Sequence, residues 1–377
     1  MGRPCIARIY LDRLQSNYRT IKNLVGPGVE LFPVVKADGY GHNSVRCGKA
    51  LLSAGAGTFC VACVEEALEL MESGVKARFI LLSGCFPGDE SAVVKAGLVP
   101  VVSDLETCGR LSAESRKQRK KVRVQVKVDT GMSRLGVATD GLWEFIGQAG
   151  GLPGLEIEGM LSHLSCPDYQ GADYLKYTRR QIEDFSLIVN GLRKKKLKLK
   201  YYHLAGSAGL IKYPEARFNS VRPGLALYGA DPFYPALEHS LHLEPVMSLV
   251  SRVCLIKNLP AGTRISYGGK SVLERKSRVG VVPLGYADGL PRSTPIGFKF
   301  LVRSKPATLL GAVTMDFIML DLTGIPEAEP GDEILIFGRE KSGAVRVEEL
   351  AEAGQTISYE IFTRLGKRVK REYQSKP

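Results

Sequence analysis

The sequence predicts an α/β protein in which a (β/α)8 TIM-type barrel is followed by a mainly β C-terminal domain. First, eight short apolar runs alternate with helical patterns through residue 228, which is typical of parallel strands joined by helices. Second, from residue 247 onward short apolar runs are separated by turn residues, and helical patterning is scarce until 347–353. Third, 377 residues are enough for two domains, which we place at residues 1–237 and 238–377.

The elements of the barrel follow in order along the chain. A helix is expected from Asp12 to about Leu24, because Gly26-Pro27-Gly28 closes its apolar pattern. Further amphipathic helices are expected between strands, at 64–73, 89–96 and 174–192. The expected barrel strands are 31–35, 58–63, 79–83, 99–103, 122–128, 157–163, 201–204 and 219–228.

The second domain is expected to be β-rich. Its strands are predicted at 250–256, 279–284, 307–313 and 334–337. Turn residues at 260–262 and 329–332 separate these runs, and one helix is expected at 347–353.

The composition is that of an ordinary globular protein, with 44% hydrophobic and 24% charged residues. No apolar run approaches the length of about eighteen residues that a membrane span needs. The first residues lack an apolar leader, so a cytoplasmic location is expected. Eight scattered cysteines suit reduced thiols in that compartment. Cys60 and Cys63 lack a second ligand pair at metal-binding spacing, and we predict no metal site.

The net charge of +13 raises the question of a polyanionic partner. Much of the charge lies in two basic segments, 116–121 and 193–200. Each falls between an expected helix and the next strand, which places it at the end of the barrel opposite the expected site. No aromatic residues interleave the first segment. We therefore expect solvated surfaces, with neither nucleic acid nor a membrane as partner.

The segment 33–42 carries the strongest functional signal. Residues 33–35 are expected to form a short buried strand, and Lys36 follows at its carboxyl end. A lysine in such a place commonly forms a Schiff base with a carbonyl, often that of pyridoxal phosphate (PLP). Gly39 and Gly41 allow the backbone to approach a ligand closely. The alternative is a lysine whose amine simply reaches the surface.

Other chemically capable residues also fall at or just after the carboxyl ends of expected strands. In barrels of this kind the active site is built at that end. Their common placement favours a site over a scatter of surface charges. The residues are Lys36, Asp129, Arg134, His163, Ser207 and Arg222.

Seven motifs together resemble those of the alanine racemases, PLP enzymes with a barrel and a C-terminal β-domain. Each motif alone is modestly specific, but their order and spacing extend from about Ala7 to Tyr373. The motifs are PVVKADGYGH at 33–42, KVDTGMSRLG at 127–136, HLAGSAG at 203–209, VRPGLALYG at 221–229, ISYGG at 265–269, PLGYADGLPR at 283–292 and GAVTMD at 311–316.

The resemblance implies roles for residues that would surround the cofactor. Lys36 would hold PLP and serve as one proton-transfer base, and Tyr267 from a second subunit would serve as the other. Arg222 would hydrogen-bond the pyridine nitrogen, and His163 would pack behind the ring. The implied phosphate ligands are Tyr40, Ser207, Gly224, Leu225 and Tyr359.

The resemblance also implies a substrate side and an assembly. Arg134 and the Met315 backbone would orient the substrate carboxylate, with Asp316 nearby. Lys127 matches a lysine that is carbamylated in some members, where it positions the arginine. The implied protein is a homodimer with shared active sites and no metal. It would interconvert L-alanine and D-alanine and supply D-alanine for peptidoglycan.

The chemistry explains why such residues are needed. Racemisation removes the α-proton from one face and returns a proton to the other, so two bases on opposite faces handle both enantiomers. Lysine and tyrosine have high ordinary pKa values, so each needs desolvation or nearby positive charge. A guanidinium keeps its own proton, so an arginine beside the pyridine nitrogen leaves that nitrogen unprotonated and disfavours transamination.

Several alternatives remain open at this point. A broader-specificity amino-acid racemase would carry the same motifs. A related barrel decarboxylase would need a catalytic cysteine in an acidic motif, whereas Cys254, the single cysteine after residue 237, lies in an apolar run. A non-catalytic PLP-binding barrel would lack the second domain and Tyr267. A basic nucleic-acid binder is disfavoured by the positions of the basic segments.

Overall fold

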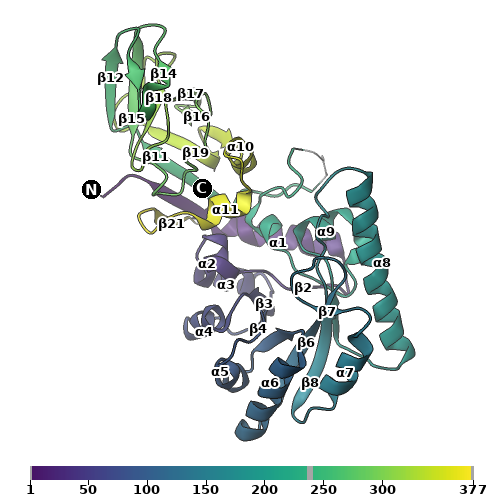
Figure 1. Ribbon diagram of the computed structural model, residues 1–377. Helices are drawn as coiled ribbons and strands as arrows, with labels where there is room; N and C mark the ends of the chain where they lie inside the picture. The colour runs from purple at the N-terminus through teal and green to yellow at the C-terminus, as the bar shows by residue number, and fades with distance from the viewer. Residues whose placement is uncertain (1, 236–240, 375–377) are drawn as a thin grey trace.

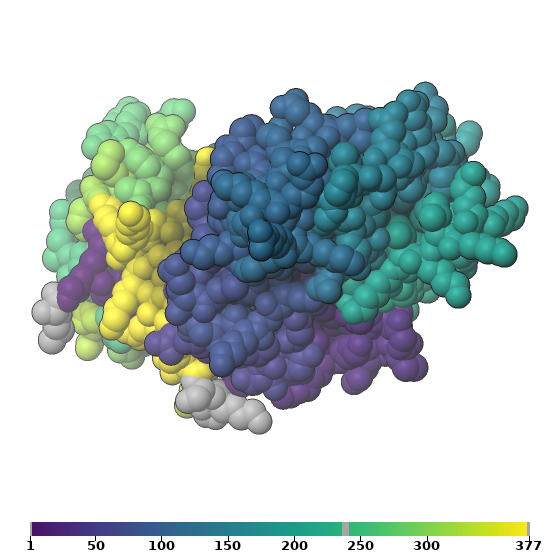
Figure 2. Space-filling model, turned by 90° about the horizontal axis from the view of Figure 1, so that it is seen from below, coloured from purple at the N-terminus to yellow at the C-terminus, as the bar shows by residue number. Residues whose placement is uncertain are grey.

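The computed structural model describes residues 2–235 and 241–374 and consists of a barrel beside a β-rich domain (Figure 1). Seen from below in Figure 2, the barrel segments in purple to teal lie next to the C-terminal segments in green and yellow. The predicted fold class is confirmed. The predicted domain boundary, between residues 237 and 238, lies outside the described residues. Among the described helices, none is long and apolar enough to cross a membrane.

Eight parallel strands form the barrel, and each overlaps one of the expected apolar runs. Six of them pair in order from β3 to β9, and β10 pairs with β2. The ring is closed at two junctions: Val34 bridges Cys60 beside β3, and the Arg222 N–H donates to the Ala205 carbonyl (3.0 Å) after β9 and β10. The strands are β2 (Glu30–Leu31), β3 (Thr58–Val61), β4 (Arg78–Leu81), β5 (Val99–Val102), β6 (Val122–Asp129), β8 (Leu155–Leu161), β9 (Tyr201–His203) and β10 (Ser220–Val221).

Helices surround the barrel, each with one face buried. In α1 the buried Leu14, Tyr18, Ile21 and Val25 recur every three or four residues, which places them on one side of the helix. The helices expected at 64–73, 89–96 and 174–192 are α4, α5 and α8. This layer comprises α1 (Leu11–Val25), α3 (Ser44–Ser53), α4 (Val64–Glu72), α5 (Glu90–Ala96), α6 (Leu105–Gln118), α7 (Leu142–Gly150), α8 (Ala172–Lys194) and α9 (Ser207–Lys212).

The C-terminal domain is built on a 10-stranded sheet that includes the first strand of the chain. That strand, β1 (Ile6–Tyr10), pairs antiparallel with β11 and parallel with β21. Two helices, α10 (Val347–Ala353) and α11 (Ser358–Thr363), connect the sheet to the barrel mouth (Figure 1). The other strands of the sheet are β11 (Met247–Arg252), β12 (Leu255–Leu259), β15 (Ser277–Val282), β16 (Lys299–Val302), β17 (Lys305–Leu310), β18 (Ile318–Asp321), β19 (Glu333–Glu340), β20 (Gly343–Val345) and β21 (Lys370–Gln374).

The expectation of one strand at 250–256 is wrong, because two strands share that run. The Val253 N–H donates to the Asp332 carbonyl, whereas the Cys254 N–H donates to the Val281 carbonyl. The chain therefore leaves β19 and joins β15 between these two residues. A continuous apolar run carries no signal for such a change of partner.

The two basic segments lie where the sequence placed them. Residues 116–121 end α6 and lead into β6, and residues 193–200 end α8 and lead into β9. Both turns precede strands, so they lie at the end of the barrel opposite the carboxyl ends of the strands. The lysines and arginines of both segments are exposed.

Candidate active site

Lys36 begins an unusual left-handed turn at the carboxyl end of the strand segment that carries it. The short element α2 (Lys36–Tyr40) contains Ala37, Asp38 and Gly39 at φ values of 52°, 53° and 61°. Left-handed backbone costs a non-glycine residue about 1–2 kcal/mol, so surrounding contacts must hold this turn. Such strain is concentrated at functional sites.

The carboxylate of Glu66 provides some of these contacts. Glu66 of α4 accepts hydrogen bonds from the backbone N–H groups of Ala37 (2.6 Å) and Ala62 (2.7 Å), so it ties the turn to the end of β3. Burial, together with the charge of Arg134, lowers the pKa of the Lys36 amine below its ordinary value. The turn thus presents an amine that loses its proton more readily than a surface lysine does.

The Lys36 side chain lines a cavity of about 1090 Å³ at the carboxyl ends of the strands. Four cationic residues line this cavity, and Glu360 is its one acidic lining residue among those described. This imbalance favours an anionic ligand. The predicted site residues that line it are Lys36, Tyr40, Lys127, Arg134, His163, Ser207, Arg222, Gly224 and Tyr359.

Arg222 is buried, and no carboxylate pairs with it in the described chain. Its Nη1 donates to the carbonyl and Nδ1 of His203 (2.8 and 2.6 Å), and its Nη2 donates to the carbonyls of Ser162 (2.6 Å) and Leu204 (3.0 Å). His163 Nδ1 lies 3.2 Å from Nη2. Burial lowers the pKa of Arg222 to about 10. These bonds use the terminal nitrogens and leave the Nε N–H without an acceptor in the described chain.

The two histidines beside Arg222 are neutral acceptors. Because a guanidinium only donates, Nδ1 of His163 and of His203 must accept, and each ring carries its proton on Nε2. His203 Nε2 donates that proton to Gln125 Oε1 (2.7 Å). Burial, with the charge of Arg222, lowers the pKa of His163 to about 3 and that of His203 well below its ordinary value.

His203 and Gln125 are site-supporting residues that the sequence reasoning missed. The available signal was a glutamine within the apolar run of β6, where an unpartnered amide would be costly.

Arg134 lies on a loop between β6 and β7 (Val137–Ala138) that is held from two sides. Asp129 Oδ1 accepts from the backbone N–H groups of Gly131 (2.9 Å) and Ser133 (3.0 Å). Tyr177 of α8 donates its hydroxyl proton to the Gly131 carbonyl (2.7 Å). The loop is therefore fastened to a strand end and to a long helix.

Lys127 points into the same cavity from β6. It is buried, and burial together with the charges of Arg134 and Arg222 lowers the pKa of its amine to about 8. A neutral amine is therefore accessible near physiological pH, as modification of this lysine requires.

A tight cradle forms another wall of the cavity. Ser207 Oγ accepts from the backbone N–H groups of Gly224 (3.0 Å) and Ala226 (3.1 Å), so its own proton remains available to a ligand. A Cβ at Gly224 would lie 2.6 Å from the Tyr40 hydroxyl, so a side chain at this position would displace Tyr40. The rings of Tyr40 and Tyr359 lie 5.7 Å apart.

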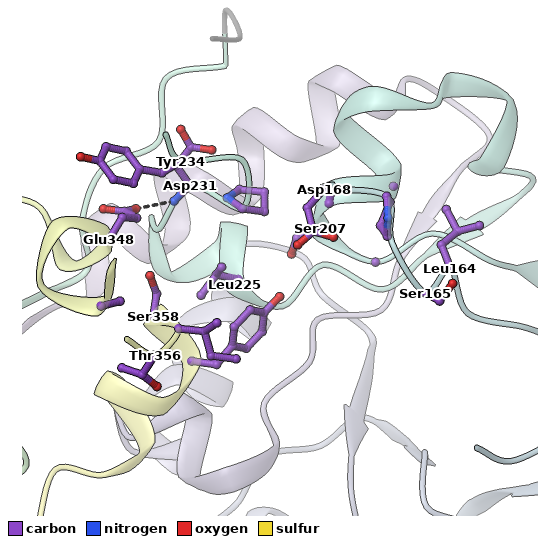
Figure 3. Close-up of a pocket in the computed structure, with 18 of the residues that line it drawn as sticks. Leu164, Ser165, Asp168, Ser207, Leu225, Asp231, Tyr234, Glu348, Thr356 and Ser358 are labelled. Carbon is purple, nitrogen blue, oxygen red and sulfur yellow. Dashed lines mark hydrogen bonds between the residues drawn. The ribbon is translucent and has the colours of Figure 1, made fainter. Parts of the chain in front are cut away.

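A second hollow, of about 410 Å³, adjoins the cavity between the barrel mouth and helices α10 and α11 (Figure 3). Leu225 lines this hollow rather than the cavity, whereas Ser207 and Tyr359 line both. Figure 3 shows Asp168 and Ser207 facing Thr356 and Ser358 of the C-terminal domain across it. Its acidic residues are Asp168, Asp231, Glu348 and Glu352.

Besides Leu225, three predicted site residues, all on the C-terminal domain, do not reach the cavity within one chain. Tyr267 is 75% exposed, Met315 is 50% exposed, and neither they nor Asp316 line the cavity. They are linked on the C-terminal domain, because Ser266 Oγ donates to the Ala312 carbonyl (2.7 Å) and so ties the Tyr267 turn to the Met315 segment. Tyr286 and Phe317 of the same domain are also exposed.

The fold and this geometry define a class of protein. It is an α/β-barrel enzyme with a lysine-bearing cationic cavity at the carboxyl ends of its strands and a β-rich second domain.

Comparison with known proteins identifies the particular family. The chain matches the family description "Alanine racemase, N-terminal domain" over residues 9–232 and "Alanine racemase, C-terminal domain" over residues 246–373. It is 40% identical over 373 residues to the alanine racemase of Pseudomonas taetrolens, which covers 98% of this chain and 99% of that protein. The chain therefore belongs to the alanine racemase family.

Solved structures agree with this assignment. The alanine racemase from D-cycloserine-producing Streptomyces lavendulae superposes with a TM-score of 0.92 at 32% identity, covering 100% of this chain and 98% of that chain. The Bacillus anthracis alanine racemase with bound L-Ala-P gives a TM-score of 0.88 at 31% identity, covering 99% and 96%. These likenesses show the fold over nearly the whole length of both chains.

Proposed function

We propose that this chain is an alanine racemase, an isomerase that interconverts L-alanine and D-alanine with PLP and so supplies D-alanine for peptidoglycan. The observation that carries the proposal is that Lys36, Arg134 and Arg222 line one cavity in a chain of this family. Eight free cysteine thiols favour work in a reducing compartment, the cytoplasm.

The residues of the cavity fit PLP. Its cationic lining suits a phosphate dianion, and the free Ser207 proton and the close approach at Gly224 suit phosphate oxygens near the backbone. The Nε N–H of Arg222 is a donor that can meet a pyridine nitrogen. Lys36 is the cavity amine at the strand end, and its lowered pKa suits covalent attachment to an aldehyde.

When bound, PLP supplies the electron sink that makes the α-proton of an amino acid removable. Lys36 takes or returns that proton on one face, since its amine is partly desolvated and more readily neutral. Arg134 orients the substrate carboxylate, and Lys127, when carbamylated, positions Arg134. Arg222, which keeps its proton, would hold the ring nitrogen unprotonated. His163, whose pKa is lowered by burial, would stay neutral and pack behind the ring.

The second base requires a second copy of the chain. We assign it to Tyr267, whose exposure on the C-terminal domain suits contact with a partner subunit. In a two-fold homodimer the C-terminal domain of each subunit would place Tyr267, Met315 and Asp316 at the cavity of the other. Tyr267 would then return or remove the proton on the face opposite Lys36.

The decisive experiment measures D-alanine from L-alanine by chiral chromatography, with a panel of other L-amino acids to test for broader specificity. Lys36→Ala should abolish the visible absorbance near 420 nm of the bound cofactor and lower racemisation by several orders of magnitude. Tyr267→Phe should retain the absorbance while racemisation falls. Normal turnover in the Lys36→Ala protein would refute the assignment of this lysine.

A further inference from the structure

Residues 314–316 of the C-terminal domain, called the Met315 segment, contact an unusual cluster of charged side chains. Asp288 is fully buried, and Arg3 donates to both of its carboxylate oxygens (3.1 and 2.7 Å). Arg368 donates to the same carboxylate with its Nε (3.2 Å). Arg3, Asp288, Asp316 and Arg368 are called the Asp288 cluster below. Arg3 precedes β1 and Arg368 precedes β21, so both ends of the chain meet at one aspartate.

The Asp288 cluster fixes the Met315 segment directly. Arg3 Nη2 donates to the Asp316 carbonyl (2.7 Å), and Arg368 Nη1 donates to Asp316 Oδ1 (2.8 Å). Both the main chain and the side chain of Asp316 are therefore held. The turn that carries Asp288 adds two backbone hydrogen bonds, from the Tyr286 N–H to the Thr314 carbonyl (3.0 Å) and from the Ala287 N–H to the Met315 carbonyl (3.2 Å).

This arrangement leaves the backbone N–H groups of Met315 and Asp316 without an acceptor in the described chain. The Met315 carbonyl is bonded, but the Met315 N–H has no acceptor within the described chain, and the residue is half exposed. Asp288 is buried, whereas Arg3, Arg368 and Asp316 are partly exposed, so the cluster is weak evidence for a stabilising role, since desolvation of Asp288 and solvent around its partners offset much of the attraction. Its clear effect is to fix the position of a segment that carries an unbonded N–H donor on a half-exposed residue.

We propose that Arg3, Asp288 and Arg368 are positioning residues that act across the dimer, holding the Met315–Asp316 segment of one subunit over the cavity of the other. The inference rests on the proposed function, in which that cavity is shared and the Met315 N–H meets the carboxylate of the amino-acid substrate. None of the three touches substrate. They act by fixing the donor before the substrate arrives.

The matched variants are Asp288→Asn and Asp332→Asn. Asp332 also accepts two bonds from one arginine, Arg303 (2.6 and 3.0 Å), but it lies just before β19 and has no hydrogen bond to the Met315 segment. Losing a hydrogen bond to a charged group corresponds to roughly a ten-fold change or more in an equilibrium constant. Asp288→Asn should therefore raise KM for alanine by about ten-fold with a smaller change in kcat, and Asp332→Asn should change neither.

Hybrid dimers purified through two different tags separate positioning from folding. In the first hybrid, a chain with Lys36→Ala and Asp288→Asn pairs with an unmodified chain, so the one site with Lys36 carries the altered segment, and KM should rise. In the second, Lys36→Ala and Asp288→Asn lie on different chains, so the one site with Lys36 carries an intact segment, and KM should be normal. Equal KM values in the two hybrids, whether raised or normal, overturn the proposal.

Two further proteins make the outcome interpretable. A Lys36→Ala and Tyr267→Phe hybrid should be active if sites are shared, and its inactivity would count against the proposed function rather than against the cluster. Arg3→Ala alters a partly exposed residue outside the sheet and provides a second route if Asp288→Asn does not fold. It should give the same difference between hybrids, and equal KM values there would also overturn the proposal.

Discussion

Gly224 illustrates how one missing side chain shapes the cavity. A Cβ there would meet the Tyr40 hydroxyl at 2.6 Å, and Tyr40 is packed between Tyr228 and Tyr359. Overpacking of this kind costs about 1–3 kcal/mol. Gly224→Ala should weaken PLP affinity roughly ten-fold or more, as measured by absorbance after equilibrium dialysis. Gly57→Ala is the control, because the space around Gly57 is open. Equal PLP affinities in the two variants would contradict a role for Gly224 in shaping the cofactor site.

Lys127 gives a prediction that depends on pH. Its pKa of about 8 means that a large neutral fraction exists at pH 8, and protonation removes the nucleophilic amine as pH falls below that value. In ¹³C-labelled bicarbonate we expect a carbamate carbon signal in the NMR spectrum at pH 8 that declines toward pH 6.5. The signal should vanish in Lys127→Arg. A signal that persists in that variant belongs to another group.

At the scale of elements, the loop that carries Arg134 depends on α8. Tyr177→Phe removes the hydroxyl that donates to the Gly131 carbonyl, a neutral bond of ordinary strength. KM for alanine should rise by roughly two- to ten-fold while the melting temperature changes little. Tyr174→Phe on the same exposed helix removes a hydroxyl without such a bond and should leave KM unchanged. Matching KM values in the two variants would show that Tyr177 does not hold the loop.

Elements with a strong hydrophobic pattern were predictable from sequence. Elements whose backbone conformation is imposed by tertiary contacts were not. The helix pattern of α8 and the apolar runs of the barrel appear in the sequence because one face or both faces of each are buried. The left-handed turn after Lys36 does not appear, because Ala37 and Asp38 have no intrinsic preference for positive φ. Contacts such as that of Glu66, 29 residues away, impose it.

The same distinction applies to the candidate site. Its barrel residues were predictable, because the carboxyl ends of barrel strands converge on one mouth and Lys36, Arg134 and Arg222 follow such ends. The contacts of Arg222 were not, because they come from two segments, at the ends of β8 and β9, that meet around one buried guanidinium. Tyr267 and Met315 stay a prediction, since a single chain leaves them outside the cavity.

For the whole molecule, two buried histidines, His42 and His203, and the partly buried His163 contribute to its response to acid. Burial lowers the pKa of His42 to about 4 and that of His163 to about 3, and it lowers that of His203 well below the ordinary value of 6.5. Below pH 6.5 the unfolded chain therefore binds protons that the folded chain does not. The contribution of these histidines to the free energy of unfolding is complete above about pH 7, and it is lost as pH falls through 6.5 toward 4.

The size of this effect can be measured directly. Each histidine adds up to about 1.4 kcal/mol per pH unit, so together they approach about 4 kcal/mol per unit near pH 5. Urea unfolding of the holoenzyme at pH 7.5, 6.5 and 5.5 should show the slope steepening in that order. His42→Gln should remove about a third of it, since His42 is fully buried and its Nε2 has no partner. A free energy of unfolding that is flat from pH 7.5 to 5.5 would mean that these histidines are not held neutral by the fold.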